Sequence, residues 1–277
     1  QVLVRNYRWG GMENTSATVL GEFSARGGDQ DDLIVHELGH QWMGDLVTCR
    51  SWEHLWLNEG WATYLEAVWA GELHGTSGYR DTLARTAASM LEHYRERPGQ
   101  APRDVPMVSN RYSSPDDPFQ KGDDVYAKGG FILHMLHERL GDEVFWKGVR
   151  LYIDRHKFGL VETDDFRRVM EEVSGESLQR FFTQWCMRAG VPDLAVSVNW
   201  LQDKSEASVI VTQRQPINGD NPAYALRVPV LLTLESGEKR WVIVDTQTRA
   251  AGEQVALPSP IKSVSVYPEM SVLGRLQ

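Results

Sequence analysis

The stretch that decides the fold covers residues 35–66 and reads V-H-E-L-G-H-Q-W-M-G-D-L-V-T-C-R-S-W-E-H-L-W-L-N-E-G-W-A-T-Y-L-E. It opens with the H-E-x-x-H pattern of His36, Glu37 and His40. Residues four apart share one face of a helix, so both imidazoles can reach a single metal ion. Glu37 lies about 100° round the same helix, from where its carboxylate can reach a water on that ion without being a ligand.

A catalytic zinc ion takes three protein ligands and keeps a fourth position for water or substrate. Eighteen residues separate His40 from Glu59, which stands in N-E-G at the head of a second helical pattern. We expect Glu59 to be the third ligand. Glu66 follows on the same helical face, and we expect it to hydrogen-bond a ligand histidine, because zinc-bound imidazoles usually donate their other N–H to such a group.

The H-E-x-x-H pattern alone is weak evidence, since chance produces it in on the order of a few per cent of chains with this composition. The alternative is a pair of surface histidines on an amphipathic helix beside a solvated glutamate. Burying these polar groups without partners would cost several kcal/mol, and a metal ion supplies the partner. The neighbouring residues favour burial, because most are apolar: Leu33, Ile34, Val35, Leu38, Trp42 and Met43.

The motif together with the later N-E-G resembles the gluzincin zinc aminopeptidases, the family of aminopeptidase N and leukotriene hydrolase. Residues 10–14, G-G-M-E-N, match that family's G-x-M-E-N, and residues 126–129, Y-A-K-G, match its Y-x-K-G. The three motifs stand in the family's order and cover about residues 7–190. The resemblance implies one Zn2+ ion on His36, His40 and Glu59, with Glu37 as the general base.

The resemblance also assigns the substrate contacts. It implies that Glu13 binds the free α-amino group of a peptide and that Tyr126 donates its hydroxyl to the tetrahedral intermediate. Glycines allow close backbone approach, so we place Gly10, Gly11 and Met12 with Glu13 in the substrate-binding segment. The expected partners are therefore peptides with a free N-terminus. Trp9 is expected to line the pocket for the first side chain.

The predicted fold class is α+β, in two domains. Residues 1–192 are expected to form a thermolysin-like, mostly helical catalytic domain with a small N-terminal β portion, truncated at its start. Period-two alternation predicts an all-β sandwich over residues 193–277. In the first domain, the patterns predict strands at 2–4, 7–9 and 17–20. They predict helices at 30–43, 58–69, 79–95, 128–140, 142–156, 163–174 and 176–189. A long loop is expected at 97–122, and the later strands at 194–198, 207–211, 226–234, 240–244 and 261–267.

Composition narrows the class of protein. The 277 residues carry 29 basic and 38 acidic side chains, a net charge of −9, which argues against a nucleic-acid binder. No run of eighteen apolar residues is present, so no membrane segment is expected. Two cysteines do not make a disulfide framework. The chain starts within a strand pattern, so we expect a fragment that lacks flanking domains; the compartment stays open, with a soluble cytoplasmic protein favoured.

Two other functions are compatible with these motifs. G-G-M-E-N, rather than G-A-M-E-N, resembles leukotriene hydrolase, which opens an epoxide as well as cleaving peptides. A non-catalytic binding module that retains the fold is the second alternative. The motifs as they stand predict zinc-dependent removal of N-terminal residues from peptides.

Overall fold

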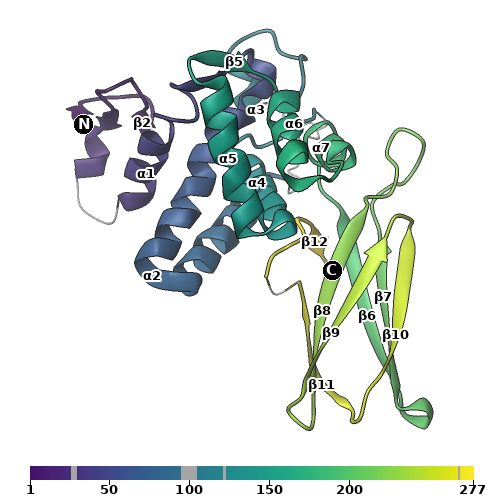
Figure 1. Ribbon diagram of the computed structural model, residues 1–277. Coiled ribbons are helices and arrows are strands. Elements are labelled where there is room, and N and C mark those ends of the chain that lie inside the picture. Colours follow the sequence, from purple (N-terminus) through teal and green to yellow (C-terminus); the bar gives the residue numbers. More distant parts are fainter. Residues whose placement is uncertain (26–29, 95–104, 121–122, 268) are drawn as a thin grey trace. The chain divides into compact units, whose positions relative to one another are not determined.

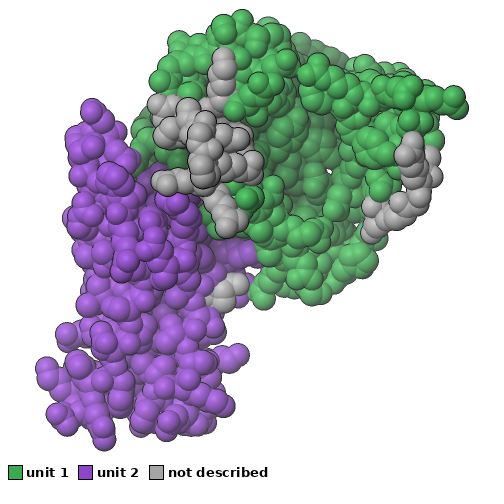
Figure 2. Space-filling model, turned by 180° about the vertical axis from the view of Figure 1, so that it is seen from behind, with its two compact units in different colours: residues 1–190 green, residues 191–277 purple. Residues whose placement is uncertain are grey.

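The computed structural model describes residues 1–25, 30–94, 105–120, 123–267 and 269–277. The chain forms two compact units, Gln1–Gly190 and Val191–Gln277, which Figure 2 colours separately. The unit boundary lies two residues before the predicted domain boundary. Helices fill most of the first unit and strands fill the second, so the predicted α+β class is confirmed (Figure 1). The assignment of a catalytic role to the first unit stays a prediction at this point.

A three-stranded sheet opens the first unit, in the order β1-β3-β2. Strand β2 (Gly11–Met12) lies at its edge, antiparallel to β3 (Val19–Gly21), which runs parallel to β1 (Val2–Val4). The predicted strand at 7–9 is wrong. The chain turns before it, because Asn6 adopts a left-handed backbone angle, φ 54°, that ends the extended run of β1. A short 3-10 helix follows at Glu22–Ala25.

Helix α1 (Asp31–Gly39) carries the first motif. Asp31 and Asp32 stand in its first turn, where negative charge stabilises the positive end of the helix dipole. The helix ends before Met43, the predicted end, because the chain turns back and Asp45 N–H donates to His40 O at 2.9 Å. His40 still has helical backbone angles, φ −61° and ψ −23°, so it keeps the helical spacing from His36.

The segment between α1 and the second motif helix contributes one strand of a two-stranded parallel sheet. Strand β4 (Val47–Cys49) pairs with β5 (Gly159–Val161), and a 3-10 turn at Trp52–His54 leads into helix α2. Helix α2 spans Trp56–His93 and is interrupted at Gly75, where φ 68° and ψ −164° are non-helical. The two helices predicted at 58–69 and 79–95 are therefore parts of one interrupted element.

Helix α4 (Ala127–Leu140) packs along α2 and buries its first ten residues (Figure 1). Helices α5 (Asp142–His156) and α6 (Thr163–Ser174) match their predicted bounds, and α3 (Asp117–Gln120) is a single turn. The rest of the loop predicted at 97–122 is irregular where it is described. Residues 26–29, 95–104 and 121–122 lie outside the described residues. The core joining these helices is aromatic, with Trp56, Trp61, Phe131, Phe145, Phe166 and Phe182 all almost fully buried.

Helix α7 (Gln179–Cys186) is shorter than the predicted 176–189. Before it, the Glu171 carboxylate accepts Leu178 N–H at 2.7 Å and holds the chain off the helical path. After it, the carbonyls of Arg188 and Gly190 accept bonds from a buried lysine instead of continuing the helix.

The second unit contains two sheets whose inward residues alternate with exposed ones. One has the order β10-β7-β6-β12 and the other β11-β8-β9. Strands β10 and β12 were not predicted: β10 reads A-A-G-E-Q-V-A, which lacks an apolar alternation, and β12 has two residues. The strands are β6 (Asp193–Leu201), β7 (Glu206–Gln213), β8 (Leu226–Leu234), β9 (Lys239–Thr246), β10 (Ala250–Ala256), β11 (Ile261–Val266) and β12 (Arg275–Leu276).

Across the described residues, no helix is both long enough and apolar enough to cross a bilayer. Cys49 and Cys186 are both free thiols.

Candidate active site

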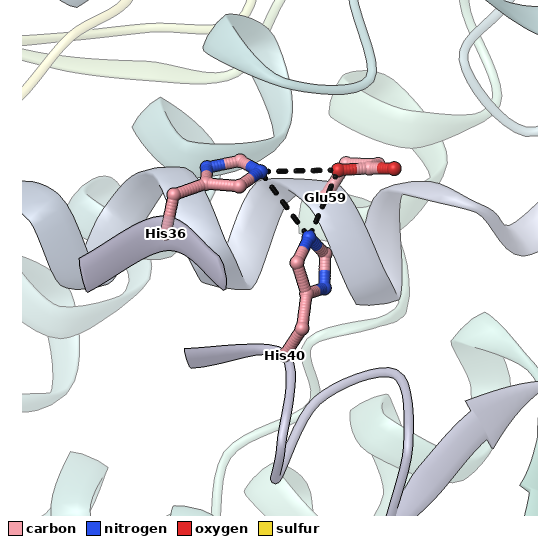
Figure 3. Close-up of side chains that lie close together, drawn as sticks. All are labelled: His36, His40 and Glu59. Atoms are coloured by element: carbon pink, nitrogen blue, oxygen red, sulfur yellow. Dashed lines mark hydrogen bonds and ion pairs between the residues drawn. The ribbon is translucent and has the colours of Figure 1, made fainter. Parts of the chain in front are cut away.

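Three side chains converge on one point: His36 from α1, His40 directly after α1, and Glu59 from α2. His36 Nε2 and His40 Nε2 lie 3.2 Å apart, and Glu59 Oε2 lies 3.4 Å from the first and 3.2 Å from the second. Figure 3 shows both rings and the carboxylate turned toward one another. Tetrahedral ligands about 2.0–2.1 Å from a zinc ion stand roughly 3.3–3.4 Å apart, so this triangle fits one such ion.

The other nitrogen of each imidazole is also held. His36 Nδ1 lies 2.8 Å from Glu66 Oε1, and His40 Nδ1 lies 3.0 Å from the backbone carbonyl oxygen of Met43. Both partners are acceptors, so each Nδ1 carries the proton and donates it. Nε2, which faces Glu59, is therefore the nitrogen of each ring that would lose its proton and bind a metal ion.

The charges of this cluster are mutually dependent. Burial lowers the pKa of His36, but hydrogen bonds to Glu59 and Glu66 outweigh burial and raise it to about 10. Burial raises the pKa of Glu59, and its bonds to the two histidines reverse this and lower it to about 2. In the metal-free protein a proton therefore occupies the position that a cation would take.

Glu37 lies beside this cluster and is 5% exposed. Burial raises the pKa of its carboxyl to about 7, with His36 and His40 opposing the shift and Glu13 adding to it. Gly11 makes the position possible: a Cβ there would lie 2.2 Å from Glu37 Oε1. A larger residue at this position would therefore require the Glu37 side chain to move.

Glu13 joins the same region from the end of β2. One ligand atom each of Glu13, Glu37 and His40 lies within 4.8 Å of the other two. Gln41, one residue after the motif, fixes this segment, because its Nε2 donates to Glu13 O at 2.8 Å. Two carboxylates this close favour a cationic group between them.

Tyr126 reaches the cluster from the start of α4. Its ring stacks on His36 with centroids 5.9 Å apart. Burial, followed by the nearby Glu59 carboxylate, raises the pKa of the Tyr126 hydroxyl well above its usual value. Helices α2 and α4 can approach closely because Gly60 of α2 faces Gly129 of α4. A Cβ on Gly60 would lie 2.8 Å from Gly129 Cα.

All of these side chains line one cavity of about 980 Å³ in the first unit. Gly10, Gly11 and Met12 line it with Trp9, as does every predicted ligand. Residues that the sequence patterns did not single out complete the wall, among them Thr48, Cys49, Arg50, Trp52, Tyr112 and Phe119. Trp52 and Phe119 are exposed aromatics, and no spacing rule separates such residues from ordinary surface ones.

The predicted site residues thus lie together in one cavity, and Glu66 contacts His36, one of the two motif histidines. Further contacts come from backbone and neighbouring polar groups: the Met43 carbonyl, Gln41, and the Asp124 carboxylate that accepts the N–H groups of Tyr126 and Ala127. His134 and His137 belong elsewhere: they bond to Tyr79 and Tyr64 at 2.8 and 2.6 Å.

An H-E-x-x-H helix whose third partner is a glutamate on the next helix defines the gluzincin class. Comparison with known proteins supports the same class. Residues 1–185 match the model of the peptidase family M1 domain. The chain belongs to this family, as the resemblance implied.

Two relatives match in sequence, and one solved structure matches in fold. The chain is 29% identical to a probable aminopeptidase 2 of Sulfurisphaera tokodaii, over 96% of this chain and 33% of the relative. It is 33% identical to aminopeptidase N of Streptomyces lividans, over 78% of this chain and 26% of the relative. The fold matches that of Legionella pneumophila aminopeptidase A in complex with aspartic acid, with TM-score 0.70 and 20% identity, over 99% of this chain and 31% of that one. The chain thus spans about a third of the length of these proteins or less.

Proposed function

We propose that this chain is the core of a zinc-dependent aminopeptidase, which hydrolyses the first peptide bond of a peptide with a free N-terminus. The observation that carries the proposal is the triangle of His36, His40 and Glu59 atoms, with edges of 3.2–3.4 Å, in the wall of a cavity that also holds Glu13 and Glu37. Membership of peptidase family M1 and the aminopeptidase relatives support it.

His36, His40 and Glu59 would hold the ion. Bound there, zinc supplies Lewis acidity for the scissile carbonyl and lowers the pKa of a water. Zinc is favoured by the donor set, since two imidazoles and one carboxylate with an open fourth position are typical of catalytic zinc sites.

The chain's own residues carry the proton transfers. Glu37 takes a proton from the attacking water and returns it to the departing amine. Its buried setting, with a pKa near 7, suits both directions of transfer at neutral pH. Tyr126, kept neutral by its raised pKa, donates its hydroxyl to the oxyanion that develops on the carbonyl.

Glu13 makes the proposed enzyme an exopeptidase. Its carboxylate would pair with the α-ammonium of the substrate within a few ångströms of Glu37 and His40. That pairing would fix the distance between the amino end of the substrate and the reacting carbonyl. An endopeptidase with the same ligands has no need of a carboxylate at this position.

The test is hydrolysis of a panel of aminoacyl-anilides by the purified chain, before and after removal of metal with a chelator and re-addition of zinc. The proposal predicts turnover that is lost with the metal, restored by zinc, and blocked by N-acetylation of the substrate. An epoxide substrate in the same series tests the leukotriene-hydrolase alternative. A zinc-loaded chain that hydrolyses no member of the panel would overturn the proposal, and one that prefers N-acetylated substrates would make it an endopeptidase.

A further inference from the structure

We propose that the buried ion pair of Asp123 and Lys128 is a positioning device for Tyr126, which sets the turn that begins α4 and so holds the tyrosine hydroxyl at the cluster of metal ligands. The inference rests on the proposed function, because it gives a role to Tyr126 in the reaction. Neither Asp123 nor Lys128 lines the cavity, and neither touches the reacting groups.

The pair is completely enclosed and fully hydrogen-bonded. Both side chains are 0% exposed, and Lys128 Nζ donates to Asp123 Oδ2. The same nitrogen donates to the carbonyl oxygens of Arg188 at 3.2 Å and Gly190 at 2.9 Å. Gly190 N–H donates back to the Asp123 carboxylate, at 3.1 and 3.2 Å from its two oxygens. All three ammonium protons therefore have an acceptor.

Stability alone does not account for such a pair. Apolar side chains of similar volume usually replace a buried ion pair without loss of stability, because they avoid the desolvation of two charges. Apolar residues make no directional contacts, whereas the bonds of Lys128 to Asp123 and to the carbonyl oxygens of Arg188 and Gly190 fix the path of the backbone. We therefore ask which part of the backbone this ion pair holds in place.

The two residues of the ion pair lie on either side of Tyr126 in the sequence. Asp123 stands three residues before Tyr126 and Lys128 two residues after it, so the pair closes the turn around it. Asp124 completes the turn, since its carboxylate accepts the N–H groups of Tyr126 and Ala127, each at 2.9 Å. Asp123 N–H donates to Val105 O at 3.0 Å and ties the turn to a separate segment.

Tyr126 needs this support because its side chain is poorly enclosed. It is 37% exposed, and its ring contacts are His36 on one side and Phe119 on the other, with centroids 5.9 and 6.0 Å away. The direction of the hydroxyl therefore depends on the backbone at the start of α4. A displacement of about 1 Å at a reacting group can cost roughly 100-fold in rate.

The test replaces both charges together, in the variant Asp123→Leu/Lys128→Met. Three readouts follow: hydrogen exchange of the Tyr126 and Ala127 amides, zinc content, and kcat and KM on an aminoacyl-anilide. We expect faster exchange at these amides, an unchanged zinc content, and a kcat lowered roughly 10- to 100-fold with KM within about threefold. Should the double variant not fold, Asp123→Asn, which keeps the shape and an acceptor, takes the same readouts.

The matched control is Val169→Ala, a truncation in the core of α6 that lowers stability away from the turn. It should leave both the exchange at Tyr126 and kcat unchanged. In a Tyr126→Phe background, the Asp123→Leu/Lys128→Met change should lower kcat no further, because residues that act through one group are not additive.

Unchanged exchange at Tyr126 and Ala127 would overturn the inference, and so would an equal loss of kcat with or without the tyrosine hydroxyl. Absence of turnover in the unaltered chain would instead refute the proposed function. In that case the exchange data still decide whether the ion pair holds the turn.

Discussion

Replacing Glu66 with alanine tests how the metal ligands are oriented. The Glu66 carboxylate accepts the His36 Nδ1 proton at 2.8 Å and is 20% exposed. A hydrogen bond to a charged group contributes about 1.5–3 kcal/mol, and each 1.4 kcal/mol changes an equilibrium constant about tenfold. We therefore expect Glu66→Ala to raise the Kd for zinc roughly 10- to 100-fold, because His36 loses both its fixed tautomer and its orientation.

Two further variants make the result specific. Glu66→Gln keeps an acceptor without the charge, so its Kd should lie between those of the original chain and Glu66→Ala. Glu72→Ala removes an exposed glutamate from the same helix and should leave Kd unchanged. The assay is competition for zinc against a chromophoric chelator at fixed pH. Equal Kd values for Glu66→Ala and Glu72→Ala would refute the reasoning.

The other predictions concern the base, the amino-group anchor and protons. Glu37→Gln should lower kcat by roughly 10²- to 10⁴-fold with one zinc ion still bound; turnover like that of the original chain would contradict Glu37 as the base. Glu13→Gln should mainly raise KM for substrates with a free amine, and an unchanged KM would remove the ammonium anchor. Zinc must displace a proton from His36, because the pKa of this imidazole is about 10. Calorimetry in buffers of different ionisation enthalpy should therefore detect at least one proton released per zinc ion at pH 7. The Kd for zinc should also rise about tenfold for each pH unit lowered, and a pH-independent Kd would contradict this.

The sequence was sufficient to predict that His36, His40 and Glu59 lie together, because their positions follow from local rules. His36 and His40 are four apart on one helix, and Glu59 begins the next, so convergence requires only that the chain between them folds back. Helices with strong stop signals were also predictable: Gly141 and Gly175 end α4 and α6 at the expected residues.

Long-range contacts decided the features that were missed. The end of α7 depends on Lys128, some sixty residues earlier, whose ammonium takes the carbonyls at 188 and 190. The close packing of the Glu37 side chain against Gly11 joins two segments far apart in the sequence. Strand β10 is held by pairing along β7 rather than by its own pattern. No propensity or spacing within one segment contains this information.

The most direct test of the proposed metal site is the zinc content of the purified chain and of Glu59→Gln, measured by atomic emission after dialysis against a weak chelator. We expect about one zinc ion per original chain and a large loss of zinc in Glu59→Gln, with unchanged circular dichroism. A Glu59→Gln variant that keeps a full equivalent of zinc would contradict a site built from His36, His40 and Glu59.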